Sequence, residues 1–208
     1  MAREDQTTIG GHVIDRATKL QVDAHRKAER ERLYALRRGM PQSNRAAETE
    51  QVIAALTDRL GDVAGKTIAF YWPIRGELDL RACMHALHRS GATVSLPVVV
   101  TRAAPVEFRT WAPGCAMTRG IWNIPVPAEG APQRPDIVIL PLVGIDADCY
   151  RLGNGGGYYD MTLASLPVAP LKIGVGQGFC RIDSIRPQPW DVRLDTAILG
   201  DGSIISAP

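Results

Sequence analysis

The chain has 208 residues, of which 45% are hydrophobic and 22% are charged, a composition typical of one ordinary globular domain. Its formal net charge of +2 at pH 7 is too small to indicate binding to nucleic acid or to a membrane surface. No apolar run approaches the length of a membrane span, and residues 1–23 lack the layout of a signal peptide. The four cysteines form no CxxC pair, which favours free thiols over disulfides or a zinc site. We therefore expect a cytoplasmic protein, and a monomer.

The beginning of the chain is polar and contains Gly10-Gly11, so we treat residues 1–24 as an extension of uncertain order and residues 25–208 as a single domain. From there, Ala24–Arg38 has the composition of a helix and is crowded with basic and acidic side chains. A charge run of this kind is usually a solvated helix face.

An amphipathic helix is predicted over Asn44–Leu60, followed by a buried strand over Thr67–Trp72. In open α/β sheets, ligands bind beyond the carboxyl ends of the strands. Trp72 and Glu77 therefore fall where a ligand would lie. For Trp72, packing in the core is the alternative, and the chemistry of the residue alone favours it.

Further strands alternate with helices along the rest of the chain. This alternation predicts an α/β fold with three layers, in which helices cover both faces of a mainly parallel, Rossmann-like sheet. The predicted strands are Thr93–Val100, Val106–Trp111, Ile137–Val143, Lys172–Gly176 and Leu194–Leu199.

Between Pro113 and Pro135 the chain is rich in proline and glycine, which predicts a long irregular segment. It carries Trp122, whose indole needs a partner. A ring of a bound ligand is one candidate for that partner, and a neighbouring loop is the other.

The most informative stretch is Arg151–Asp160, because it lies between a predicted strand and a helix predicted over Tyr159–Leu166. Four of the five residues 153–157 are glycine, so backbone N–H groups could approach phosphate oxygens closely. Arg151 adds a fixed charge for those oxygens, and Asp160 could hold a divalent cation. The alternative is a glycine-rich turn with an exposed arginine and an aspartate at a helix start. The spacing is neither a Walker A loop nor a Rossmann fingerprint.

These residues, Arg-Leu-Gly-Asn-Gly-Gly-Gly-Tyr-Tyr-Asp, resemble the signature of the 5-formyltetrahydrofolate cyclo-ligase family. Two other segments resemble the same family in the same order: Trp122–Pro127 (Trp-Asn-Ile-Pro-Val-Pro) and Asp191–Asp195 (Asp-Val-Arg-Leu-Asp). The resemblance covers roughly residues 26–195.

The resemblance implies a ligase that uses ATP and Mg²⁺ to close 5-formyltetrahydrofolate into 5,10-methenyltetrahydrofolate, with small molecules and no nucleic acid or membrane as partners. By position, it implies a phosphate contact from Arg26, for which a shift of one residue would choose Lys27. The ATP site implied in full is Arg26, Arg30, Arg151, Leu152, Gly153, Asn154, Gly155, Gly156, Gly157, Tyr158 and Tyr159. The implied folate contacts are Trp72, Glu77, Trp122 and Tyr158, and the implied metal ligands are Asp160 and Asp191.

The chain also departs from the family pattern. Gly176 is followed by Gln177-Gly178-Phe179-Cys180-Arg181, and Trp190 stands before Asp191 where a histidine is common. These departures leave two alternatives open. One is a divergent paralogue that uses another formyl compound, and the other is a relative that binds folate or nucleotide without catalysis.

Overall fold

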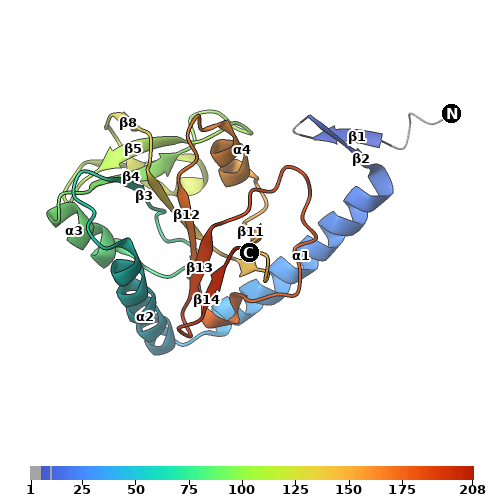
Figure 1. The fold of residues 1–208 in the computed structure, drawn as a ribbon, viewed down its shortest axis with the longest axis horizontal. Helices are drawn as coiled ribbons and strands as arrows, with labels where there is room; N and C mark the ends of the chain where they lie inside the picture. Colours follow the sequence, from blue (N-terminus) through green and yellow to red (C-terminus); the bar gives the residue numbers. More distant parts are fainter. Residues whose placement is uncertain (1–5, 10) are drawn as a thin grey trace.

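The fold is known from a computed structural model that describes residues 6–9 and 11–208. Its centre is an eight-stranded sheet with the order β14-β13-β12-β9-β3-β4-β5-β8 (Figure 1). The run from β13 to β4 is parallel, whereas β14, β5 and β8 pair antiparallel at the two ends. The strands are β3 (Thr67–Ala69), β4 (Thr93–Val98), β5 (Glu107–Trp111), β8 (Pro132–Gln133), β9 (Ile137–Pro141), β12 (Leu171–Gly176), β13 (Thr196–Leu199) and β14 (Ile204–Ser206).

Helices cover both faces of this sheet, which confirms the predicted three-layer α/β fold. On one face, α2 (Gln42–Leu60) and α3 (Arg81–Arg89) share a hydrophobic cluster with the sheet. On the other face, α4 (Tyr158–Ser165) contributes to a second cluster. The long helix α1 (Arg16–Gly39) packs beyond the strand ends through a third, smaller cluster around Leu33.

The central strand β9 shows why its sequence is apolar throughout. Ile137 and Ile139 belong to the cluster under α2 and α3, whereas Val138 and Leu140 belong to the cluster under α4. Successive side chains of a strand point to opposite faces, so a strand that is buried on both sides needs apolar residues at every position.

The amino-terminal part contains more structure than the sequence predicted. The helix α1 begins at Arg16 rather than Ala24, and its N-cap is Asp15, whose Oδ2 accepts from the N–H of Thr18 at 2.7 Å. Before it, β1 (Gln6–Ile9) and β2 (His12–Asp15) form an antiparallel hairpin. The polar composition concealed this start because the helix buries few side chains in its first turns.

The segment between Pro113 and Pro135 is also more regular than predicted. The strands β6 (Met117–Arg119) and β7 (Pro125–Pro127) pair antiparallel around the short 3₁₀ helix η1 (Ile121–Asn123). Trp122 and Asn123 have φ values of 56° and 61°, so two consecutive left-handed residues close this hairpin. Such residues leave no alternating pattern, which is why the sequence indicated an irregular loop.

Strand β3 ends at Ala69, earlier than the predicted Trp72, although the N–H of Phe70 still donates to the carbonyl of Ser95 at 2.9 Å. Its neighbours are β4, which follows it in the chain, and β9. The strands that follow β9 in this sheet, β12, β13 and β14, are added on the side away from β4. The gap between β3 and β9 is therefore a topological switch point, where open α/β sheets bind ligands. Among the described residues, no helix has the length and apolar character that a membrane crossing requires.

Candidate active site

A cavity of about 920 Å³ opens at this switch point. Its floor includes Tyr71 and Trp72, which follow β3, and Pro141 at the end of β9. Its walls come from α1, the segment 121–126, the glycine-rich loop and residues 188–192. The volume lies at the upper end of the range for small-molecule sites.

The glycine-rich loop begins on the short strand β11 (Arg151–Leu152), which pairs with β10 (Gly144–Ile145), and ends at the first residue of α4. Leu152 is buried and fixes the start of the loop. Gly155 and Gly157 have φ values of 98° and 67°, which residues with a Cβ atom rarely adopt. The sequence therefore uses glycine because the loop turns through left-handed conformations at the rim of the cavity.

Two arginines stabilise this loop, Arg30 from α1 and Arg151 from the strand on which the loop begins. The Nε of Arg30 donates to the carbonyl of Gly153 at 2.8 Å, and burial lowers the pKa of Arg30. Arg151 Nη2 lies 3.2 Å from Asp160 Oδ2, and its guanidinium lies 5.3 Å from the centroid of the Tyr159 ring. Both guanidinium groups line the cavity, so fixed positive charge gathers around the loop.

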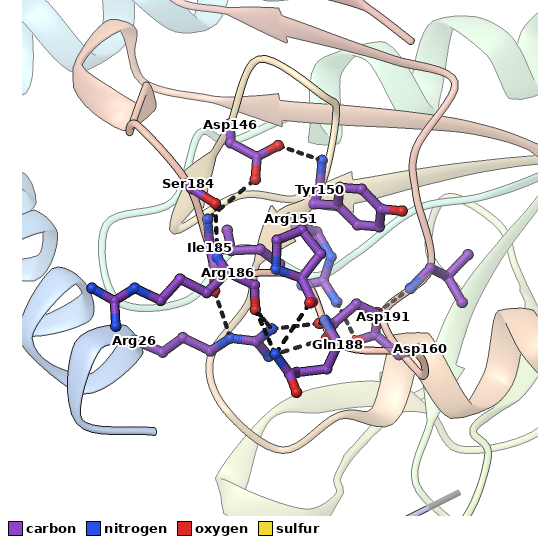
Figure 2. Close-up of polar contacts among 12 residues, drawn as sticks. Arg26, Asp146, Tyr150, Arg151, Asp160, Ser184, Ile185, Arg186, Gln188 and Asp191 are labelled. Atoms are coloured by element: carbon purple, nitrogen blue, oxygen red, sulfur yellow. Dashed lines mark hydrogen bonds and ion pairs between the residues drawn. The ribbon is translucent and has the colours of Figure 1, made fainter. Parts of the chain in front are cut away.

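Arg26 anchors a second segment of the cavity wall (Figure 2). Its Nη1 donates to Asp191 Oδ1 at 3.1 Å, and its Nη2 pairs with Asp191 Oδ2. Its Nε and Nη2 also donate to the carbonyls of Ile185 and Arg186 at 2.9 and 3.0 Å. Lys27, the alternative for this position, is exposed and lies outside the cavity lining.

The two aspartates named as metal ligands lie at neighbouring places on the wall. Asp160 Oδ1 accepts from the N–H of Val192 at 3.1 Å, so the start of α4 touches the 191–192 segment, as Figure 2 shows. Asp191 Oδ2 also accepts from the N–H of Gln188 at 2.5 Å. Within residues 6–9 and 11–208, no group of three or more histidine, cysteine and acidic side chains could hold a metal. Mg²⁺ commonly takes one or two carboxylates together with phosphates and waters, so this pair of carboxylates fits such an ion.

Glu77 lies in the same cavity at the floor, and only 7% of it is exposed. Its Oε2 accepts from the N–H of Ile74 at 3.0 Å, and Arg37 Nη1 lies 4.0 Å from its Oε1. Burial raises the pKa of Glu77, and the hydrogen bond from Ile74 and the charge of Arg37 oppose this only in part. Gln177 Nε2 donates to the carbonyl of Gly76 at 2.7 Å and so supports the loop that carries Glu77.

The aromatic residues named as folate contacts also line the cavity. Trp122 is 58% exposed and meets Tyr158 edge to face, with ring centroids 5.3 Å apart. Trp72 is partly buried, and the guanidinium of Arg81 lies over its ring, 5.3 Å from the ring centroid. Trp122 therefore lines the cavity with Tyr158 as its aromatic neighbour, and more than half of its side chain remains exposed.

The sequence prediction missed Arg37 and Tyr34. Arg37 is 2% exposed and its Nη2 donates to the carbonyl of Leu142 at 2.5 Å, whereas Tyr34 donates its hydroxyl to Asn154 Oδ1 at 2.5 Å. A signal existed, because Arg26, Arg30 and Arg37 are spaced by four and seven residues and so share one helix face. That face meets the cavity and the core. Lys19 and Asp23 near the start of α1 also line the cavity, whereas Lys27, Glu31 and Arg38 are exposed.

Known proteins resemble this chain over most of its length. The model of the 5-formyltetrahydrofolate cyclo-ligase family matches residues 22–200. A 5-formyltetrahydrofolate cyclo-ligase of Mycolicibacterium smegmatis is 28% identical over 82% of this chain and 91% of its own.

Two solved structures share the fold. The 5,10-methenyltetrahydrofolate synthetase of Aquifex aeolicus gives a TM-score of 0.75 at 26% identity, over 87% of this chain and 92% of that one. The Mycoplasma pneumoniae enzyme of the same name gives 0.69 at 26% identity, over 83% and 96%. Because the family model spans all three motifs, the glycine-rich loop among them, the chain belongs to the 5-formyltetrahydrofolate cyclo-ligase family.

Proposed function

We propose that this enzyme closes 5-formyltetrahydrofolate into 5,10-methenyltetrahydrofolate and converts ATP into ADP and phosphate. One observation carries the proposal: the glycine-rich loop with its arginines and the buried carboxylate of Glu77 open into one cavity. The loop has the properties of a phosphate site. Glu77 has those of an acceptor for the paired N–H groups of a reduced pterin, so both substrates fit side by side.

The chemistry requires activation of a poor electrophile. In the proposed reaction the formyl oxygen attacks the γ-phosphorus, and the bond between that phosphorus and the β,γ-bridging oxygen breaks to release ADP. N10 then forms a bond to the formyl carbon and loses its proton. Phosphate leaves with the former formyl oxygen, and the methenyl bridge remains. Phosphoryl transfer of this kind depends chiefly on positioning and on neutralising charge.

The residues of the cavity divide these tasks by their chemistry. Arg30 and Arg151, with the N–H groups of residues 153–157, would bind phosphate oxygens. Arg26 would join them after exchanging its carboxylate partner for phosphate. Asp160 and Asp191 would hold Mg²⁺, which when bound neutralises charge on the phosphates.

The folate would lie beside the γ-phosphate, at the end of the cavity that contains Glu77. Glu77 would accept from the pterin, and Trp72, Trp122 and Tyr158 would contact its rings. The departure from the family pattern at Gln177 is compatible with this assignment, because that side chain supports the loop of Glu77 from within the protein. We expect small molecules as the only partners, a monomer, and a cytoplasmic location.

Two measurements test the proposal against its alternatives. Isothermal titration with ATP–Mg²⁺ should show one binding site per chain, and an absorbance assay should show formation of methenyltetrahydrofolate from 5-formyltetrahydrofolate. ATP binding with turnover of another formyl compound only would indicate a divergent paralogue. Binding of ATP or folate without any turnover would indicate a non-catalytic relative.

A further inference from the structure

The hairpin formed by β1 and β2 lies outside the region that the family model matches, which starts at residue 22. Ile9 and His12 nevertheless line the cavity, together with Lys19 and Val22 of α1. Ile9 and His12 are directly opposite each other in the hairpin, so one turn of this chain presents both. This end of the cavity is therefore formed in part by residues that precede the region matched by the family model.

Helix α1 gives the order of subsites along the cavity. Arg37 near its carboxyl end lies beside Glu77, Arg30 contacts the glycine-rich loop, and Arg26 contacts the 185–191 segment. With a rise of about 1.5 Å per residue, Arg26 lies about 16 Å along the axis from Arg37, and Lys19 lies about 10 Å further in the same direction. Pterin, phosphates and hairpin thus follow one another along the helix.

This order decides what the hairpin end can bind, and the argument rests on the proposed function. The γ-phosphate must face the formyl group of a pterin held at Glu77. The nucleoside then points away from Glu77, towards Lys19 and the hairpin. The walls there suit a flat ring, because Ile9 and Val22 are aliphatic and Trp190 offers an aromatic face.

We infer that the hairpin end of the cavity is the nucleoside subsite, in which Ile9, Val22 and Trp190 enclose the purine of ATP. The hairpin itself supports this assignment, since none of its described residues belongs to a hydrophobic cluster of the core. An isolated two-stranded hairpin is marginally stable in water, and a base packed under it supplies the missing apolar contact.

Isothermal titration of the full chain with ATP–Mg²⁺ and with tripolyphosphate–Mg²⁺ separates the base from the phosphates. Trp190→Ala should weaken ATP binding by about tenfold or more, since one stacked base contributes an effect of this order. Ile9→Ala should weaken it by a smaller factor. Both variants should bind tripolyphosphate like the wild type. Val13→Ala is the matched control, because Val13 is 63% exposed on the same hairpin and lies outside the cavity lining.

Hydrogen exchange gives a second readout. Amides of the hairpin should exchange more slowly with ATP–Mg²⁺ than with tripolyphosphate–Mg²⁺. Unchanged ATP affinity in both Ile9→Ala and Trp190→Ala would overturn the inference and leave the proposed function standing. Loss of folate affinity with unchanged ATP affinity would also overturn it, by assigning this end to the folate tail. A wild-type protein that binds neither ATP nor tripolyphosphate would contradict the proposed function itself.

Discussion

Burial opposes the ionised form of the Glu77 carboxylate and raises its pKa. Carboxylates with shifted pKa values cluster at functional sites. If Glu77 accepts two N–H groups of the pterin, its replacement leaves those donors buried without partners. We expect Glu77→Gln to raise the KM for 5-formyltetrahydrofolate by about tenfold, ~1.4 kcal/mol, with unchanged ATP affinity. Glu50→Gln, at an exposed position of α2, is the control. Wild-type kinetics in a folded Glu77→Gln enzyme would assign Glu77 a role in the structure only.

The same residue predicts a pH dependence. Because burial raises the pKa of Glu77, its ionised form is lost at a higher pH than for an exposed glutamate. The KM for 5-formyltetrahydrofolate should therefore rise as the pH falls through that raised pKa, since the protonated carboxyl accepts fewer hydrogen bonds. Glu77→Gln does not titrate, so its KM should lack this component. Parallel pH profiles of KM for the two enzymes would contradict the assignment.

Arg37 is the buried counterpart of Glu77, and its Nε and Nη1 have no hydrogen-bond partner among the residues that the structure describes. Breaking a buried pair by removing one partner leaves the other charge uncompensated. We expect Arg37→Met to lower the free energy of unfolding by about 3 kcal/mol, measured by urea denaturation. Arg38→Met, at an exposed neighbouring position, should have little effect.

A double-mutant cycle separates the pair from the packing of the long side chain. If the charges interact, Arg37→Met combined with Glu77→Gln should be less destabilised than the sum of the single variants. Additive losses would show that Arg37 acts through its hydrogen bond to the Leu142 carbonyl and its packing.

Among the elements, the glycine-rich loop is the one whose structure the sequence predicted best. Glycine at four of five positions permits backbone conformations with positive φ. The structure adopts such conformations at Gly155 and Gly157. The parallel sheet was equally predictable, because strands such as β9 are buried on both faces and carry an unbroken apolar run.

Helix α1 was predictable only in part. Its composition gave the helix, but a charge run has the same appearance whether the charges face water or a cavity. Arg37 is buried because Glu77 and the Leu142 carbonyl lie opposite it, and those partners are 40 and 105 residues away in sequence. The pairing of Arg26 with Asp191 was missed for the same reason. Long-range partners of this kind leave no local pattern.

The glycine-rich loop also supports a prediction about Arg151, which lies two residues before Gly153. A Cβ at Gly153 would lie 2.2 Å from Arg151 Nη1, so Gly153→Ala must displace the guanidinium. That group is the end of a flexible side chain, and the fold should survive. We expect ATP affinity to fall about tenfold in titration calorimetry. Gly39→Ala is the control, because a Cβ there meets nothing within 4 Å. Normal ATP affinity of Gly153→Ala would show that Arg151 is not needed in its present position.

At the scale of the whole molecule, the cavity lies between α1 and the sheet, and α1 joins the core through the small hydrophobic cluster around Leu33. Ligands that bridge α1 and the glycine-rich loop should therefore stabilise the folded state as a whole. At a free ATP–Mg²⁺ concentration of 100 times Kd, binding contributes about 2.7 kcal/mol. For a domain of this size, that corresponds to a rise in Tm of roughly 5–10 °C.

Arg151→Ala tests whether this stabilisation depends on the phosphate contact. Loss of a charge-assisted hydrogen bond costs roughly 1.5–3 kcal/mol of binding, so the Tm shift at the same ATP–Mg²⁺ concentration should be at least halved. Differential scanning calorimetry with and without ligand measures the shift, and Arg59→Ala, at an exposed position on α2, should keep all of it. An equal shift in wild type and Arg151→Ala would remove Arg151 from the phosphate site, because a residue that binds the triphosphate must contribute to the stability which the triphosphate confers.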